Sequence, residues 1–236
     1  MIVSIHQPNY LPWAGFFHKL SLCDQFVLLD TVPFSKNSYQ NRCKIKTVQG
    51  EAWLTVPVRT SGRFGQLTNQ VEADQESGWN LRHWRVIEQN YRRAPHFRFL
   101  ADCIEPVFRA EWALLADGAS ELIIRIVAAL ELLVPLIRSS SLSVTGSRSE
   151  LLCAICKSLD ATVYLSGPSG KTYLDLTPFR EAGIRVEYHS FASPVYPQLY
   201  GEFIPALSVI DLLANCGPSS KDYLLGGSRV LSPDSM

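Results

Sequence analysis

Residues 2–30 read IVSIHQPNYLPWAGFFHKLSLCDQFVLLD, and this stretch decides the fold that the sequence predicts. Ile2–Ile5 is a short β-rich run that a Gln-Pro-Asn turn breaks, and Phe16–Cys23 has apolar residues at a helical spacing. Gln25–Asp30 is a continuous apolar run that ends in a carboxylate, which is typical of a buried parallel strand. A strand, a short helix and a second strand within thirty residues predict a βαβ unit.

His6, Gln7 and Asp30 stand where the two strands of this unit end. The carboxyl ends of parallel strands meet at one edge of a sheet, and α/β proteins bind their ligands there. We therefore predict that His6 and Asp30 are catalytic and that Gln7 binds substrate. His6 could contact phosphates or act as an acid or base, or it could only fix the turn by hydrogen bonds.

The charge of Asp30 needs a partner, because an uncompensated carboxylate at the end of an apolar strand is costly. Lys36, Arg42 and Lys44 are the cations nearby in the sequence. Asp30 would orient an amine or bind magnesium that is held by phosphates, or it would form a structural salt bridge.

The segments that follow the two strands are both expected to shape a pocket. Two prolines and two aromatic residues stiffen the first turn, where the candidate binding residues are Asn9, Tyr10 and Trp13. Residues 34–45 (FSKNSYQNRCKI) are polar and lack a hydrophobic period, which is typical of a binding loop. The catalytic candidates in this loop are Lys36, Asn41 and Arg42, and Lys44 is a candidate binding residue.

Residues 166–172 (SGPSGKT) follow a predicted strand and resemble a phosphate loop. A Walker A motif needs a glycine where this chain has Leu165, and a helix after it, so an ordinary P-loop is rejected. Backbone N–H groups and a lysine can still cradle an anion, or the segment is a plain glycine turn. The candidate binding residues here are Ser166, Gly167, Ser169, Gly170 and Lys171. Gln198 and Tyr200 lie in a later aromatic loop that would line the pocket or only cover the core.

The remaining pattern predicts one α/β domain over residues 1–226. A mixed or mostly parallel sheet is assembled from the N- and C-terminal segments, with a helical insertion at about 79–137 between them. Residues 227–236 are expected to be a disordered tail. The further strands are predicted at 52–58, 142–144, 162–165 and 184–188, and the further helices at 149–159, 178–182 and 207–213.

The composition is that of a globular protein and excludes several function classes. The chain has 236 residues, 47% of them hydrophobic, and 22 basic against 22 acidic side chains. This is too apolar for disorder, and zero net charge disfavours a general nucleic-acid binder.

Zero net charge hides an asymmetry along the chain. Residues 36–98 contain eleven basic and five acidic side chains, a local charge of +6, and the rest carries eleven and seventeen, or −6. Such a separation indicates a surface for a nucleotide, a nucleotide-sugar or an RNA, unless the basic residues scatter over solvated faces.

The cysteines and apolar stretches point to a cytoplasmic protein with no membrane span. No signal peptide precedes the six cysteines, and charged residues interrupt the longest apolar stretch, residues 112–137. Cys153 and Cys156 could form a redox or metal pair, but their apolar helical pattern favours buried reduced thiols. No metal ligands are assigned, and the oligomeric state stays open.

Several of these motifs together resemble the WbqC-like family. They are IHQPNYLPWAGFFHKL, the strand that ends in Asp30, FSKNSYQNR with Lys44-Ile45, WLTVPV, YLSGPSGKTYLD and YPQLYGEFIPALSVIDLLANCG. The resemblance covers nearly the whole chain, and Cys43 stands where we expect Asn. The family occurs in bacterial surface-polysaccharide and related biosynthetic clusters. The resemblance implies a glycine transferase that acylates an amino sugar.

The first motif is also similar to that of nucleotidylyltransferase-like ligases, which make an acyl-adenylate. His6 would match a phosphate-binding histidine of that fold, whereas Phe16 stands where a second histidine is wanted and His18 comes two residues late.

The sequence therefore predicts an acyltransferase or amide ligase that joins an activated amino acid, plausibly glycine, to a small-molecule amine. The amino acid would be activated with ATP and Mg²⁺, or it would arrive on an aminoacyl-tRNA. The alternatives are a non-catalytic protein that binds a nucleotide or nucleotide-sugar, and an RNA-binding accessory protein.

Overall fold

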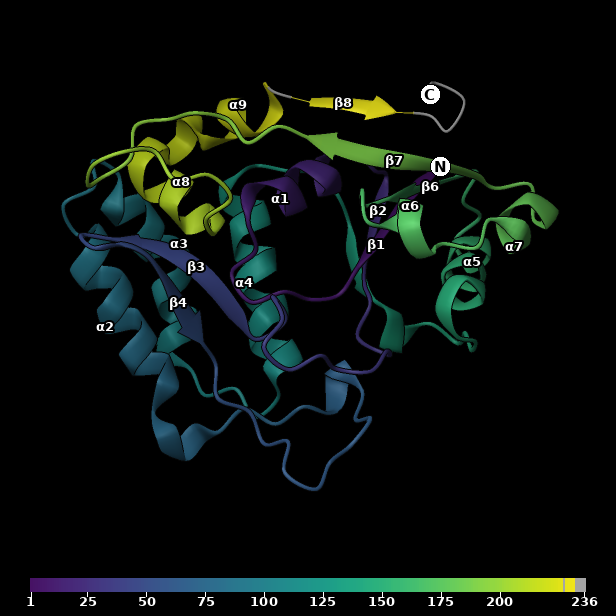
Figure 1. Cartoon of the computed structure of the whole chain (residues 1–236), viewed down its shortest axis with the longest axis horizontal. Helices are drawn as coiled ribbons and strands as arrows, with labels where there is room; N and C mark the ends of the chain where they lie inside the picture. The colour runs from purple at the N-terminus through teal and green to yellow at the C-terminus, as the bar shows by residue number, and fades with distance from the viewer. Residues whose placement is uncertain (227, 232–236) are drawn as a thin grey trace.

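The computed structural model describes residues 1–226 and 228–231, and six strands within them form one sheet (Figure 1). Their order is β5-β2-β1-β6-β7-β8, in which all but β8 are parallel. This confirms the predicted α/β class with a mixed, mostly parallel sheet. The strands are β1 (Ile2–His6), β2 (Gln25–Leu28), β5 (Leu136–Arg138), β6 (Val163–Ser166), β7 (Arg185–Phe191) and β8 (Ser228–Leu231).

The order of the parallel strands places a reversal in the middle of the sheet. From β1 the chain builds outward to β2 and β5, then returns through α5 (Arg148–Ser158) to β6 on the other side of β1. In chain order the parallel strands therefore lie 3-2-1-4-5, which is the order of doubly wound nucleotide-binding sheets. Such sheets bind ligands where the order reverses, which here is between β1 and β6.

Helices cover the two faces of the sheet, as the alternation of buried side chains in β2 requires. Phe26 and Leu28 belong to the larger hydrophobic core, whereas Val27 belongs to a second core with α5. Figure 1 shows α1 and α4 on one side of the strands and α5 and α7 on the other. The larger core includes α1 (Ala14–Ser21), α2 (Trp79–Tyr91), α3 (Phe97–Arg109), α4 (Leu115–Ala129), α8 (Val209–Cys216) and α9 (Ser220–Leu225), and the second includes α7 (Thr177–Glu181).

The polar segment 34–45 is a loop only in its first part. β3 (Arg42–Thr47) and β4 (Gly50–Thr55) pair as an antiparallel hairpin, so the expectation of a loop through Ile45 was wrong. Cys43 and Ile45 are buried, whereas Arg42 and Lys44 on the opposite face are only half-buried. This is the period of a half-buried strand, which charged residues on one face concealed.

Strand β5 also differs from the sequence prediction, which placed a strand at 142–144. Glu131 adopts a left-handed φ of 51° and Pro135 cannot donate a backbone hydrogen bond, so the helical segment ends early. Leu136–Arg138 then pairs with β2, and a 3-10 turn, Ser139–Ser141, follows it.

At the C-terminus, residues 228–231 of the predicted tail pair with β7 as β8, and residues 227 and 232–236 lie outside the described residues. Among the described residues, none of the helices has the length and hydropathy of a membrane span.

The turn from β1 into α1 depends on a close contact between Trp13 and Gly15. A Cβ at Gly15 would fall within the Trp13 ring, so the ring would have to move. We expect Gly15→Ala to lower the free energy of unfolding in urea by about 1–3 kcal/mol. In a Trp13→Ala background the same substitution should cost much less, and an equal cost in both backgrounds would contradict this packing.

Candidate functional site

A pocket of about 590 Å³ lies at the carboxyl ends of β1 and β6, where the strand order reverses. This volume is within the usual range for small-molecule sites. None of the described residues that line the pocket is acidic, whereas three of them carry basic groups. The lining residues are Ile5, His6, Gln7, Lys19, Leu29, Val32, Arg148, Leu151, Leu152, Tyr164, Ser166, Gly167, Ser169 and Tyr173. The pocket therefore suits an anionic ligand with an apolar part.

His6, at the end of β1, presents a neutral imidazole to the pocket. Its Nδ1 lies 2.9 Å from the carbonyl of Gln7, which can only accept, so Nδ1 carries the proton and Nε2 is left as an acceptor. Burial, together with the charge of Lys19, lowers the pKa of His6 to about 3. The ring packs edge-on against Phe16 at 5.0 Å between ring centroids. A neutral His6 can therefore accept a hydrogen bond from a hydroxyl or amine of a ligand.

Lys19, on α1, is the buried basic group of the pocket. Its side chain is almost completely buried, and Nζ donates to the Ile5 carbonyl at 3.1 Å. Nζ also lies 5.5 Å from the centroid of the Phe26 ring. Burial lowers the pKa of Lys19 to about 7, a shift that the neighbouring Cys23 opposes. The ε-amine therefore loses its proton far more readily than that of an ordinary lysine.

The predicted anion loop after β6 contributes three of its five candidate binding residues to the pocket. Ser166, Gly167 and Ser169 line it, and Gly170 begins a single helical turn, α6 (Gly170–Tyr173). A Cβ at Gly170 would collide with Ser166 Oγ, so the turn needs glycine there. The short α6 does not make an ordinary P-loop, in agreement with the sequence.

Arg148 lines the pocket from the beginning of α5. Its side chain is exposed and its backbone has a left-handed φ of 50°, which is unfavourable for a residue with a Cβ. Gly146, two residues earlier, has a φ of 142° and approaches the backbone of Leu151. Strained backbone of this kind is concentrated at ligand sites in proteins.

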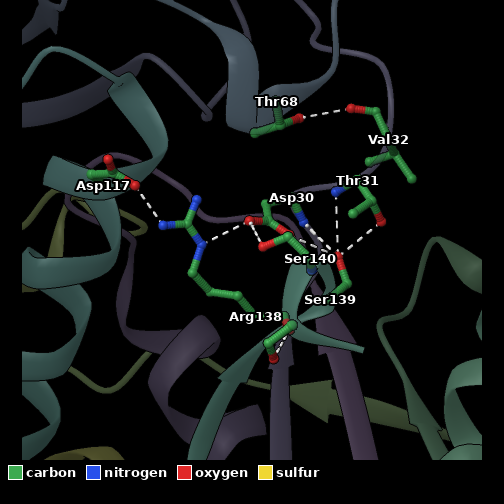
Figure 2. Close-up of polar contacts among 9 residues, drawn as sticks. Asp30, Thr31, Val32, Thr68, Asp117, Arg138, Ser139 and Ser140 are labelled. Atoms are coloured by element: carbon green, nitrogen blue, oxygen red, sulfur yellow. Dashed lines mark hydrogen bonds and ion pairs between the residues drawn. The ribbon is translucent and has the colours of Figure 1, made fainter. Parts of the chain in front are cut away.

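Asp30 is not in the pocket but in a buried network at the end of β2 (Figure 2). Oδ1 accepts hydrogen bonds from Ser139 Oγ (2.8 Å) and from the Ser140 N–H (2.9 Å). Oδ2 accepts from Arg138 Nε and Ser140 Oγ, both at 2.7 Å. Figure 2 shows Arg138 between Asp30 and Asp117, and Arg138 forms an ion pair with Asp117 as well.

This network corrects two expectations for Asp30. Its cation is Arg138, and Lys36, Arg42 and Lys44 all lie elsewhere. Both of its carboxylate oxygens are occupied by donors of the protein, so the geometry favours the structural alternative over orienting an amine or binding magnesium. Burial alone would raise the pKa of Asp30, but hydrogen bonds from Ser140, Arg138 and Ser139 hold it below its ordinary value.

The candidates from residues 34–45 are not among the residues that line the pocket. Asn41 is buried, and its amide bridges the Asn37 N–H and the Val56 carbonyl, both at 3.1 Å. The other three lie at the surface or on one face of the hairpin. Lys36 bonds Thr60 Oγ1 at 3.3 Å, the Arg42 guanidinium lies over the Trp53 ring at 4.2 Å, and Lys44 pairs with Glu51 at 2.7 Å.

The candidates from the first turn pack into the protein as well. Tyr10 is buried, with its hydroxyl 2.7 Å from His83 Nδ1, and Asn9 is also buried. Trp13 stacks edge-on against Phe191. None of the three lines the pocket, and of the candidates predicted in residues 6–13 only His6 and Gln7 do.

The C-terminal aromatic loop covers the hairpin rather than the pocket. Gln198 Oε1 accepts from the buried Lys46 at 2.9 Å, and Tyr200 donates to the Asn90 carbonyl at 2.8 Å. Lys171 belongs to the anion loop and lies in α6, with Nζ 5.5 Å from the centroid of the Tyr188 ring, but it does not line the pocket.

The basic segment 36–98 contributes no residue to the pocket. Lys46 is buried, and four other basic side chains of the segment are in ion pairs. These are Lys44, Arg59, Arg63 and Arg98. Among the described residues, ion pairs therefore occupy four of the eleven basic side chains of the segment, and the anion-suited pocket is built from residues within 5–32 and 148–173.

Two basic groups of the pocket were missed from the sequence. Lys19 comes three residues after Phe16 and four before Cys23, which places it on the apolar side of the helical pattern. A lysine on an apolar face was the signal in the sequence that could have identified it. Arg148 gave no such signal, because a lone arginine before a helix is common.

Cys153 and Cys156 are free and buried, as expected. In the described part of the chain, no group of three His, Cys, Asp or Glu side chains could hold a metal ion.

Fold and pocket define an α/β protein with a candidate anion site at the reversal point of a doubly wound sheet. The chain belongs to the WbqC-like protein family, whose model matches residues 7–223. The protein Rv1507c of Mycobacterium tuberculosis (strain ATCC 25618 / H37Rv), which is uncharacterized, is 37% identical over 224 residues, or 94% of this chain and 96% of that protein. No solved structure matches the chain. The resemblance in the sequence motifs is thereby confirmed at the level of the family.

Proposed function

We propose that this protein is an acyltransferase or ligase that forms an amide between an activated amino acid, plausibly glycine, and a small amine such as an amino sugar. The observation that carries the proposal is the pocket between β1 and β6, which has basic groups and no acidic lining residue among those described. The phosphate of an aminoacyl-adenylate is an anion, and it matches the basic groups of these walls.

The lining residues would divide the work of binding and orientation. Arg148 and the hydroxyls of Ser166 and Ser169 would hold the phosphate of the adenylate. The neutral imidazole of His6 would accept a hydrogen bond from the acceptor amine and orient it, a role that was predicted for Asp30 from the sequence.

Activation with ATP and Mg²⁺ fits these residues with one restriction. Because no described carboxylate lines the pocket, a magnesium ion would be held mainly by phosphate oxygens. All six cysteines are free thiols, which fits the proposed cytoplasmic location, where ATP is available.

The proposal is tested by exchange of labelled pyrophosphate into ATP, with and without glycine. We expect exchange that depends on glycine. Exchange could instead be absent while glycine is transferred to an amine only when glycyl-tRNA is supplied. That result would show that the acyl donor is the aminoacyl-tRNA. Nucleotide binding without exchange or transfer would favour the alternative, a non-catalytic nucleotide or nucleotide-sugar binding protein.

Arg148→Ala should raise the KM for ATP by about 10- to 100-fold, because one charge-assisted hydrogen bond to a phosphate is lost. Its melting temperature should stay unchanged, because the side chain is exposed. Arg85→Ala is the matched control, since Arg85 is an exposed arginine on α2 that does not line the pocket. Equal KM values in the two variants would contradict the assignment of Arg148.

A further inference from the structure

We propose that Lys19 is the proton acceptor of the amide-forming step, a role that rests on the proposed function. Its Nζ lines the pocket at the carboxyl end of β1 and is held 3.1 Å from the carbonyl of Ile5, the residue before His6. The side chain is only 3% exposed, and within the described part of the chain this carbonyl oxygen is its one hydrogen-bond acceptor. The nitrogen can therefore still exchange a proton with a ligand in the pocket.

The groups around Lys19 keep its amine from being permanently charged. His6 of β1 and His189 of β7 face it with neutral rings, and each is affected by its charge. Cys23, two residues after the end of α1, has a pKa raised by burial to about 12 and stays a thiol near neutral pH. Arg148 adds a positive charge to the lining, and no acidic side chain is among the described lining residues. An ammonium at this place would have no counter-ion.

The other candidate bases do not meet the need for a proton acceptor. His6 has Nδ1 bonded to Gln7, and its lowered pKa makes Nε2 a very weak base near pH 7. Asp30 has both oxygens occupied by donors in its own network. Lys19 is thus the group in the described lining whose protonation changes near neutral pH.

The proposed step balances in atoms and charge. The nitrogen of the acceptor amine attacks the carbonyl carbon of the acyl-adenylate and forms the C–N bond. The bond between that carbon and the phosphate oxygen breaks, and adenylate leaves with its electron pair. The proton that the nitrogen loses passes to Nζ of Lys19, which becomes an ammonium and later releases the proton to water.

The first test compares Lys19→Met, which keeps the apolar stem, with the full-length wild-type chain. We expect kcat for amide formation to fall about 10²- to 10⁴-fold with the KM for ATP nearly unchanged. The wild-type rate should rise with pH to a plateau, with an apparent pKa near 7, and this rise should be absent in the variant. Lys157→Met, at an exposed lysine of α5, is the matched control and should behave as the wild type.

A second test does not depend on activity. Acetylation of the wild-type protein with acetic anhydride is followed residue by residue by mass spectrometry as the pH is raised. Labelling of Lys19 should level off just above pH 7, whereas that of a lysine in a model peptide keeps rising to about pH 10. A midpoint near pH 7 is not expected of a lysine with a merely structural role.

The outcomes separate this proposal from the proposed function. If the wild type forms amide and Lys19→Met retains its rate and pH profile, Lys19 is not the proton acceptor and the proposed function stands. If Lys19 labels with the midpoint of an ordinary lysine, the proposal is also overturned. If Lys19 labels as expected but no donor supports exchange or transfer, the proposed function fails and its proton-transfer step fails with it.

Discussion

Arg138→Met is expected to lower the free energy of unfolding by about 3–5 kcal/mol, because it leaves the carboxylate of Asp30 buried without its cation. Asp30 is completely buried, and Arg138 Nε lies 2.7 Å from its Oδ2. Methionine keeps the apolar stem of the side chain, so the loss reports the charge and not the packing. Urea unfolding at pH 7 measures the difference.

Arg125→Met is the matched control for this prediction. Arg125 pairs with Glu121 on α4 at the same distance, 2.7 Å, but both side chains are about one-third exposed. A pair that is open to solvent contributes about 0–1 kcal/mol. Losses of similar size in the two variants would show that burial of Asp30 does not govern the stability of its network.

The double variant Asp30→Asn with Arg138→Met should recover part of the loss, since it removes the buried charge as well as its partner.

The stability that Asp30 contributes also has a defined pH range. Its pKa in the folded protein lies below the ordinary value, so the contribution is complete above about pH 4 and disappears as the pH falls through the folded-state pKa.

The same network shows where prediction from the sequence ends. The βαβ unit was predictable because its signals lie within residues 2–30, and the structure has β1, α1 and β2 there. The partner of Asp30 was not, because Arg138 is 108 residues away along the chain. A nearby cation in the sequence is a poor guide when the acid ends a strand whose neighbour in the sheet arrives much later.

The candidate site was predictable for the residues that end a strand. His6 and Ser166 end β1 and β6, and the rule that ligands bind at carboxyl ends places both at the pocket. The residues of the polar segment 34–45 were predicted to bind a ligand only because the segment is polar and lacks a hydrophobic period. Polar side chains there serve local structure, as the two hydrogen bonds of Asn41 show, and composition does not distinguish such donors from those that face a ligand.

Four histidines should make the protein acid-labile well above the pH at which carboxylates are protonated. Burial lowers the pKa of His6 to about 3 and those of His83 and His189 to about 4, and it also lowers the pKa of His18. His18 and His189 contact each other at 2.7 Å between Nδ1 and Nε2. One proton fits between these two nitrogens, so a second proton on the pair would add repulsion between two buried cations.

The sign of this effect follows from where each state binds protons. An unfolded chain protonates its histidines near pH 6.5, whereas the folded protein keeps these four neutral to lower pH. Between those values the unfolded state holds more protons, so the free energy of unfolding falls as the pH falls. Each histidine contributes a slope of up to about 1.4 kcal/mol per pH unit. The proton uptake of Lys19 is complete below about pH 7 and adds little to this slope.

We therefore expect a loss of several kcal/mol between pH 7 and pH 5, which is comparable with the whole stability of many domains. Urea unfolding at pH 7, 6 and 5 gives the slope. His83→Gln should reduce this slope by the contribution of about one bound proton. The variant should also lose some stability at pH 7, because Tyr10 loses the hydrogen bond between its hydroxyl and His83. His96→Gln, at an exposed ring, is the matched control for the loss of a histidine. A wild-type free energy of unfolding that does not change from pH 7 to pH 5 would mean that the buried rings take up protons as readily as those of the unfolded chain.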